Sequence, residues 1–340
     1  MAAEIDPTTM CTVKPGTKVV ENMISGRNDP GIFSFFEASS IRKIKDKYVF
    51  IYSRFTKDGE FGLPVSNYTL AYAYSDHPLG PWTYGGTIID GRGREINEQG
   101  DTIASGVVDG NTHGSICEIK GQWYVFYHRQ AGLDEYARQA MVAPIDVKVE
   151  EGAGGKVVIS EGEYNSEGFA LNGLNPLERH SAGIACWITG PTIAKHEWPK
   201  HFYSGSYVET SYGTETNFTA PYDLKNNTNR IVNNTDGSIV GYKYFNFSDM
   251  KGNPRLLLRL VPEGIDGTIT IMADRPWTSQ GGKELGTIQL KADMPQQSTE
   301  LSADLPALSE LTGKHALFFK FSSDTKEKSL CKLEDFVFER

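Results

Sequence analysis

The chain has 340 residues, of which 39% are hydrophobic, enough to fill the core of one large domain or of two ordinary ones. Its formal net charge of -9 argues against a nucleic-acid-binding surface, because phosphate contacts need clustered Lys and Arg side chains. No apolar run reaches the roughly 18 residues of a transmembrane helix, and the first residues lack the basic and apolar regions of a signal peptide. These properties predict a globular protein with no nucleic-acid or membrane partner.

Composition also narrows the fold class. Gly (35), Phe (17) and Tyr (16) are frequent and long stretches of helix-forming residues are few, which predicts an all-β fold of short strands joined by turns. The four cysteines are spread along the chain without a CxxC pair or a Cys/His spacing. Neither a zinc site nor a disulfide framework is therefore indicated, and four separate, mostly buried thiols are expected.

The first part of the chain contains a repeat. Residues 40–54 align without a gap with residues 115–129, at a constant offset of 75 residues. Each run reads as a strand, a tight turn and a second strand rich in aromatic and β-branched residues, which predicts two hairpins. A further strand pair is expected after each hairpin, formed by residues 70–75 with 84–89 in the first copy and by 137–142 with 156–160 in the second. Each copy is therefore predicted to hold about four strands.

Tandem groups of four antiparallel strands suggest the blades of a β-propeller. The alternative, two unrelated hairpins, fits less well with the matching turns and the ungapped register. Residues 1–6 and 12–20 resemble only the second strand pair of the repeat, so the chain is expected to begin in mid-blade. Propellers close with about four to eight blades. Two and a half blades are therefore expected to leave open faces.

The repeat pattern stops after residue 165. Residues 166–190 contain Gly- and Pro-rich turns and are predicted to be a linker. Residues 191–340 are predicted to form a β-sandwich or jelly roll, because short strands recur between Gly, Pro, Asn and Asp residues, at 239–247, 255–260, 268–271, 316–321 and 336–338. Strict alternation would place Tyr242 and Tyr244 on one face of the first of these strands and Lys243, Phe245 and Phe247 on the other.

The repeat region resembles glycoside hydrolase family 43. The motif Phe-Phe-Glu-Ala-Ser-Ser at residues 35–40, followed by Tyr-Val-Phe-Ile-Tyr at 48–52, matches one blade of this family in order and spacing. The motif Gly-Asn-Thr-His-Gly-Ser at residues 110–115, followed by Trp-Tyr-Val-Phe-Tyr-His at 123–128, matches the last blade. The resemblance covers residues 1–165. It implies a five-bladed propeller that hydrolyses arabinose- or xylose-containing plant polysaccharides with inversion, using three carboxylates around a central pocket.

The resemblance assigns one of these carboxylates. Glu37 takes the place of the general acid that protonates the departing glycosidic oxygen, a role that requires a raised pKa. The base that activates water and the Asp that tunes the acid come from earlier blades in the family, and neither has a counterpart here. Five aspartates in turns and loops were considered as replacements and none is assigned: Asp6, Asp76, Asp90, Asp101 and Asp109.

Three further residues match family positions. His113 corresponds to a histidine that points into the propeller axis, where many members hold calcium mainly through water, although a lone His is more often hydrogen-bonded in a core. Arg138 resembles an active-site arginine that holds sugar hydroxyls, and its alternative is a surface arginine. Phe35 is a candidate aromatic wall for a sugar ring, although a Phe beside an inner strand more commonly packs in the core.

The region 191–340 resembles the family 6 carbohydrate-binding modules, chiefly at residues 236–245 and 333–338. Such modules often hold a structural calcium near the last strand, which here implies Asp335 or Glu334. Trp277 is the best-placed loop aromatic for stacking on a sugar, and burial at the edge of a core is the equal alternative. No organic cofactor is expected, and calcium is the one metal implied.

Four functional hypotheses follow. The first is an inverting glycosidase acting on xylan, arabinan, arabinoxylan or derived oligosaccharides, with Glu37 as the acid. The second is a non-catalytic carbohydrate-binding protein whose working part is the sandwich. In the third, a separate polypeptide supplies the missing blades by pairing with the open strand edges. The fourth, retaining fructan cleavage, needs a nucleophilic Asp, and the Glu-Ala-Ser-Ser context favours the pentosidase.

Overall fold

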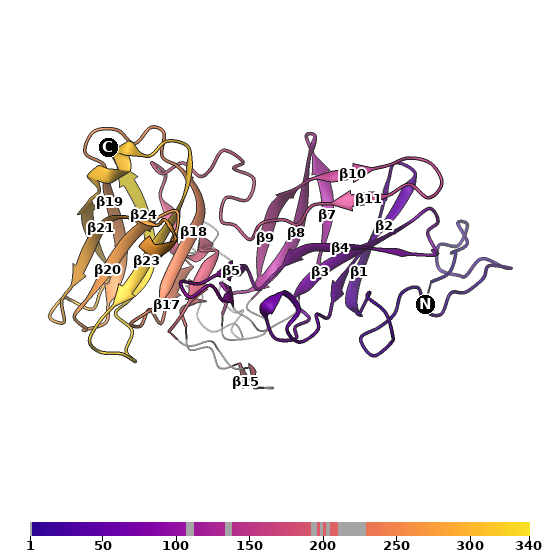
Figure 1. The fold of residues 1–340 in the computed structure, drawn as a ribbon, viewed down its shortest axis with the longest axis horizontal. Coiled ribbons are helices and arrows are strands. Elements are labelled where there is room, and N and C mark those ends of the chain that lie inside the picture. Colours follow the sequence, from indigo (N-terminus) through magenta and orange to yellow (C-terminus); the bar gives the residue numbers. More distant parts are fainter. Residues whose placement is uncertain are drawn as a thin grey trace. The chain divides into compact units, whose positions relative to one another are not determined.

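The computed structural model describes residues 2–106, 112–132, 138–191, 196–197, 200–201, 205–209 and 229–340 (Figure 1). The chain divides into two compact units: residues 1–91, 110–128 and 140–163 form the first, and residues 92–109, 129–139 and 164–340 the second. Strands make up nearly all of the regular structure, so the all-β prediction is confirmed. In the described part of the chain, no helix combines the length and apolar character needed to cross a membrane.

The first copy of the repeat forms one antiparallel sheet in the order β1-β2-β3-β4. Its strands are β1 (Phe35–Ile44), β2 (Lys47–Arg54), β3 (Thr69–Ser75) and β4 (Thr83–Asp90), with a short 3-10 helix η1 (Glu60–Gly62) between β2 and β3. The turn between β1 and β2 starts at Lys45, whose φ of 53° allows the tight reversal. All four strands of this copy were predicted from the sequence.

The second copy forms a three-stranded sheet of β7 (Gly114–Ile119), β8 (Gln122–Gln130) and β9 (Arg138–Ile145). The fourth strand predicted for this sheet is wrong: β11 (Val157–Ile159) pairs with β10 (Val147–Val149) instead of with β9. The Tyr72 hydroxyl donates to the Val157 carbonyl at 3.3 Å and accepts from the Ile159 N–H at 3.0 Å. A tyrosine of the first copy therefore occupies backbone groups of β11 that a neighbouring strand would otherwise bind.

The two copies meet along their first strands. The hydroxyls of Ser40 in β1 and Ser115 in β7, which are equivalent positions of the repeat, form a hydrogen bond of 2.9 Å. The Arg42 Nε donates to the Ile116 carbonyl at 3.4 Å. Corresponding residues of consecutive copies are thus direct neighbours, so β1 and β7 form one polar seam inside the first unit.

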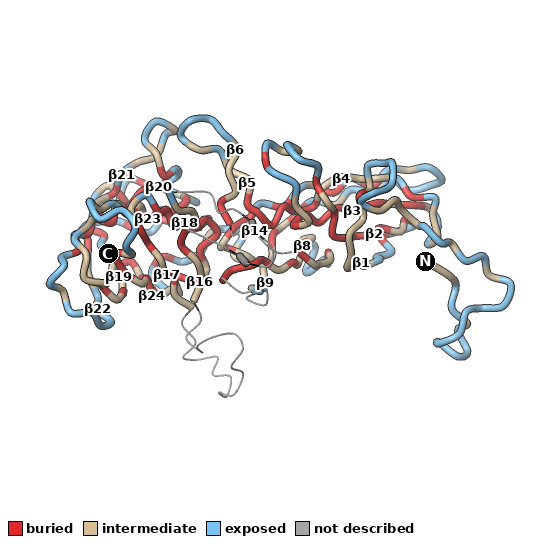
Figure 2. Tube along the Cα trace, turned by 90° about the horizontal axis from the view of Figure 1, so that it is seen from below, coloured by how far each residue is buried: buried red, intermediate tan, exposed pale blue. Residues whose placement is uncertain are grey.

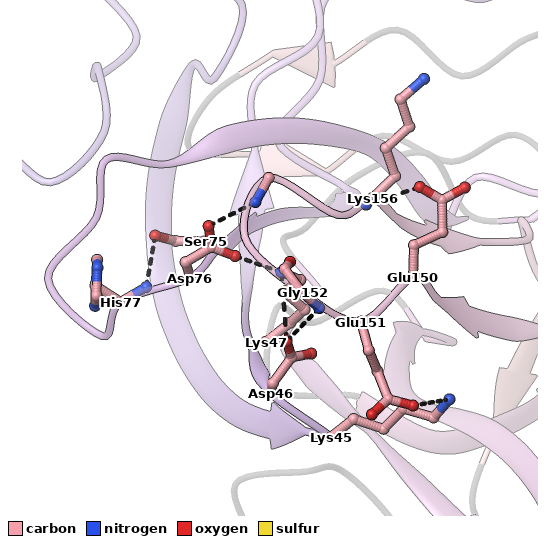
Figure 3. A network of polar contacts seen from close by, with 11 residues as sticks. Lys45, Asp46, Lys47, Ser75, Asp76, His77, Glu150, Glu151, Gly152 and Lys156 are labelled. Carbon is pink, nitrogen blue, oxygen red and sulfur yellow. Dashed lines mark hydrogen bonds and ion pairs between the residues drawn. The ribbon is translucent and has the colours of Figure 1, made fainter.

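A buried lysine fixes the far end of the first hairpin (Figure 3). The side chain of Lys47 is 1% exposed, and its ammonium donates to Asp76 at 2.5 Å and to the Gly152 carbonyl. The Gly152 N–H donates to Asp46 at 2.8 Å and the Gly154 N–H to Asp76 at 2.9 Å. Lys47 holds the pKa of Asp76 below its ordinary value by this hydrogen bond. The network therefore joins the β1–β2 turn, the end of β3 and the loop before β11.

We expect Lys47→Met to lower the midpoint of thermal unfolding far more than Lys45→Met. Lys45 is the matched control, because its ion pair with Glu151 at 2.9 Å is exposed on both sides and such pairs contribute little. The Asp76 contribution is fully present above 3.8, its ordinary pKa, and is lost as the pH falls through the lowered value. Melting curves at pH 7 and pH 3 should show the variant and wild type converging in acid. Equal losses for both variants would contradict this account.

The second unit is built around two sheets packed face to face (Figure 1). One sheet contains β16 (Tyr207–Glu209), β17 (Arg230–Val232), β24 (Cys331–Glu339), β19 (Arg255–Pro262) and β22 (Thr299–Asp304), with β12 (His180–Ser181) beside β24. The other contains β13 (Trp187–Thr189), β18 (Ile239–Asn246), β23 (Lys314–Ser322), β20 (Gly267–Ala273) and β21 (Lys283–Leu290). The remaining elements are β5 (Arg94–Ile96) with β6 (Thr102–Ala104), β14 (His196–Glu197) with β15 (Lys200–His201), η2 (Ala182–Ile184), η3 (Thr278–Gln280) and η4 (Pro306–Glu310).

An apolar core fills the space between these sheets. Phe336 of β24 lies 4.8 Å from Tyr242 of β18 and 5.5 Å from Phe319 of β23, between ring centroids. All three side chains are fully buried, and Figure 2 shows the buried backbone in red along these strands. The five strands predicted for this region are present, and β21 and β22 are additional.

The alternation predicted for residues 242–247 is wrong. A register shift between Tyr242 and Phe245 interrupts the pairing of β18 with β23. The irregularity puts Tyr242, Phe245 and Phe247 into the same core, whereas Tyr244 belongs to a second cluster with Trp187 and Phe318. A period of two holds only along an unbroken ladder, so a bulge changes the face of every later residue.

Trp277 lies at the edge of this second cluster. Its ring centroid is 5.9 Å from that of Trp187, and Ile103 of β6 packs against the same cluster. The nearby Arg275 guanidinium is 3.2 Å from Glu95 of β5, and Glu95 also binds Lys243. These contacts agree with the core-edge alternative for Trp277.

The four cysteines are all free thiols. Cys186 and Cys331 are buried, and burial raises the pKa of both thiols. Cys11 and Cys117 are exposed, so the expectation of mostly buried thiols holds for half of them.

Candidate active site around Glu37

Glu37 lies near the start of β1, where the strand is irregular. Phe35 pairs with Arg54 and Glu37 with Ser53, so Phe36 is an extra residue, and a second register shift follows before Ser40. Ala38 has a φ of 55°, a left-handed conformation that costs energy for a residue with a side chain. Bulges of this kind redirect side chains beside active sites. Here they set the direction of Glu37, whose side chain is 39% exposed.

His113 contacts Glu37 directly. Its Nε2 lies 2.7 Å from the Glu37 Oε1, and the residue immediately precedes β7. A carboxylate would accept this bond from a protonated Nε2, whereas a carboxylic acid would donate it to an unprotonated Nε2. The pair can therefore hold a shared proton on either partner, as a residue that gives up a proton and recovers it must.

His128 fixes His113 from behind. The backbone N–H of His113 donates to the His128 Nε2 at 3.1 Å, and the two rings meet edge to face with centroids 5.0 Å apart. The His128 Nε2 must be an acceptor in this bond, which makes the ring neutral with its proton on Nδ1. The Ser53 hydroxyl, opposite Glu37, donates to the Thr112 carbonyl. Both partners of the Glu37–His113 pair are thus held by the second strands of the two hairpins.

Sequence reasoning did not select Ser53 or His128. The two residues are equivalent positions of the repeat, 75 residues apart, at the end of each aligned run. Position in the repeat was therefore the available signal, since Ser40 and Ser115 at the start of the same runs also contact each other.

The aromatic residues beside Glu37 have separate surroundings. Phe35 packs against Tyr52 and Phe50, with ring centroids 5.8 and 6.2 Å away, inside a hydrophobic cluster. Phe36 meets Phe55 edge to face at 4.7 Å, and the Arg27 guanidinium lies 4.2 Å above the Phe55 ring. The structure thus gives Phe35 a packing role, and its contact with sugar stays a prediction.

Arg138 is the first residue of β9 and is exposed. It belongs to the second unit and is described apart from the Glu37–His113 pair, which lies in the first. Its role in substrate binding stays a prediction. The aspartates left unassigned have local partners where they are described: Asp6 accepts from Thr8 at 2.6 Å, and Asp101 from Asn97 at 3.4 Å. Residues 107–111, with Asp109 and part of the His113 motif, lie outside the described residues.

The residues proposed for calcium do not fit that ion. The Asp335 carboxylate is 2.6 Å from the Arg179 guanidinium and 3.4 Å from that of Arg259, so positive charge already faces both of its oxygens. Glu334 accepts a hydrogen bond of 2.5 Å from Ser298. The His113 Nε2 is bound to Glu37. Among the described residues, no group of three or more His, Cys, Asp or Glu side chains could hold a metal.

Known proteins provide an independent comparison. A xylosidase/arabinosidase of Thermoclostridium stercorarium is 31% identical over 301 residues, which are 87% of this chain and 56% of that protein. The predicted resemblance to the xylosidases and arabinosidases of glycoside hydrolase family 43 is confirmed. The chain spans about half the length of this curated relative. No family model matches the chain.

Two solved structures resemble the chain more loosely. A family 43 arabinoxylan arabinofuranohydrolase of Bacillus subtilis, in complex with cellotetraose, is 21% identical, with 98% of this chain and 58% of that chain covered and a TM-score of 0.44. A β-1,3-glucan-binding family 6 carbohydrate-binding module of Bacillus halodurans is 19% identical, with 49% of this chain and 98% of that chain covered and a TM-score of 0.34. Both likenesses are too loose to locate single residues.

Proposed function

We propose that these residues belong to a glycosidase that removes arabinose or xylose from plant polysaccharides or oligosaccharides by inverting hydrolysis. The observation that carries the proposal is the contact of 2.7 Å between Glu37 and His113 at the bulged start of β1. Homology to a xylosidase/arabinosidase supports the substrate class. In the reaction Glu37 gives its proton to the departing glycosidic oxygen, while a water attacks the opposite face of the sugar.

The inverting mechanism needs a second carboxylate, roughly 6.5–9.5 Å from the acid, to take a proton from the water. In this proposal the base and the Asp that tunes Glu37 come from propeller blades outside these 340 residues, carried by the same or a separate polypeptide. Residues 1–165 then supply the last two and a half blades, residues 166–190 a linker, and residues 191–340 a sugar-binding sandwich. No step uses calcium.

The configuration of the released sugar tests this proposal. We expect proton NMR of arabinoxylan oligosaccharides treated with the natural polypeptide containing these residues to show the pentose first in the anomeric configuration opposite to that of the bond cleaved. Mutarotation would then restore the equilibrium mixture. Initial release with the original configuration would contradict the inverting mechanism and favour a nucleophilic carboxylate.

A second candidate, a non-catalytic carbohydrate-binding protein, is favoured by the two-sheet sandwich of the second unit. Affinity electrophoresis on xylan and arabinan separates the two candidates. Retardation of the chain by either polymer, together with no release of pentose by the natural polypeptide, would support binding as the function.

A further inference from the structure

A pocket of about 590 Å³ lies in the first unit, at the opposite end of β1 from Glu37. Its lining combines charged and apolar side chains: Lys43, Ile44, Lys45, Glu118, Trp123, Val147, Lys148 and Val149. A strand rises about 3.3 Å per residue, which puts the pocket roughly 20 Å from Glu37 along β1. It is therefore separate from the candidate active site, and its volume is within the usual range for small-ligand sites.

The repeat builds this pocket asymmetrically. Lys43 and Tyr48 of the first copy are equivalent to Glu118 and Trp123 of the second, at the offset of 75 residues. In the first copy the Lys43 ammonium lies over the Tyr48 ring, 5.6 Å from its centroid. In the second copy Glu118 and Trp123 are paired across the β7–β8 hairpin. The second copy thus contributes a larger aromatic surface to the pocket, and β10 supplies the remaining wall.

Positive charge is concentrated at the pocket in a chain whose net charge is -9. Three lysines and one glutamate line it. Lys45 is held by Glu151 at 2.9 Å, on the outside of the turn. Lys148 lies in the middle of β10, opposite Val158, and is exposed. Within the described residues, no ion pair joins Lys148 to a carboxylate. An anionic group entering the pocket would meet this ammonium directly.

We propose that the pocket binds an acidic oligosaccharide, in which one sugar carries a carboxylate. The partly buried Trp123 and its apolar neighbours Val147 and Val149 offer a surface for the C–H face of a sugar ring. Lys148 supplies a charge-assisted hydrogen bond to the carboxylate, and Lys43 adds positive potential. The aromatic wall selects for a sugar over a simple anion. This site does not depend on hydrolysis at Glu37.

Calorimetric titration of the whole chain tests the proposal, with xylotriose carrying one glucuronic acid as the probe and unsubstituted xylotriose and inorganic phosphate as comparisons. We expect saturable binding of the acidic probe, at least tenfold tighter than that of either comparison. Lys148→Ala should weaken it about tenfold, the usual effect of losing one charge-assisted bond, and raising the salt concentration should weaken it further. Lys57→Ala, an exposed lysine away from the pocket, is the matched control and should change nothing.

Trp123→Leu separates sugar binding from anion binding. Leucine keeps an apolar strand residue and removes the flat surface, so we expect the acidic probe to lose affinity at least fivefold while thermal unfolding confirms a folded chain. Equal binding of phosphate and the acidic probe would overturn the assignment to a sugar. No saturable binding of the acidic probe at millimolar concentration, or full affinity in Lys148→Ala, would overturn the site.

Discussion

Glu37→Gln is expected to lower kcat/KM on arabinoxylan oligosaccharides by roughly 10²–10⁴-fold, the range for loss of a general acid. Glutamine keeps the size of the side chain and a hydrogen bond to His113, which is 2.7 Å away, but has no proton to give. The loss should depend on the leaving group. Dinitrophenyl pentosides need little protonation to depart, so they should be cleaved by the variant at close to the wild-type rate.

The dependence on leaving group separates an acid from a base or a purely structural residue. Loss of a base would slow attack by water on both kinds of substrate, and misfolding would also affect both equally. Glu21→Gln is the matched control, because Glu21 is an exposed glutamate of the same unit. An equal loss on both substrates with a folded chain would remove Glu37 from the role of acid. Unchanged cleavage of the oligosaccharides would do the same.

The parts of the first unit that sequence could predict are those governed by local pattern. The two hairpins follow from the alternation and turn chemistry of residues 40–54 and 115–129, which the repeat made visible. The contact between Glu37 and His113 joins residues 76 positions apart. It depends on two bulges and on a left-handed Ala38, none of which has a sequence signature of its own. The residue types of the site were predictable, and their hydrogen bonds were not.

Longer-range pairing explains the other differences. Whether β11 joins β9 or β10 depends on Tyr72, a residue 85 positions before Val157. The register shift in β18 depends on its fit to β23, about 70 residues later in the chain. In β21, Leu285, Ile288 and Leu290 are buried between exposed polar residues, a pattern weakened by the uneven spacing of its apolar residues. Tertiary context thus decided strand partners that a period of two could not.

Asp335 shows how a resemblance can indicate the right residue with a different role. The residue lies in β24, between β12 and β19, paired with Ser181 on one side and Arg259 on the other. Its side chain is 7% exposed and faces two guanidinium groups, of which Arg179 also binds Glu300 at 2.8 Å. Positive charge of this kind replaces what a cation would supply. The carboxylate therefore joins the segment before β12 to the sheet by ion pairs.

We expect Asp335→Asn to reduce the free energy of unfolding by about 1–3 kcal/mol, the cost of leaving charged hydrogen-bond partners without their acceptor. Urea denaturation of the whole chain, with and without calcium and EDTA, measures it. Because the carboxylate is satisfied by Arg179 and Arg259, wild-type stability should be the same in calcium and in EDTA. Asp293→Asn, an exposed carboxylate of the same unit, should be neutral. Stabilisation of the wild type by calcium that disappears in Asp335→Asn would instead establish a metal site, and the arginines would then have to move aside to admit the ion.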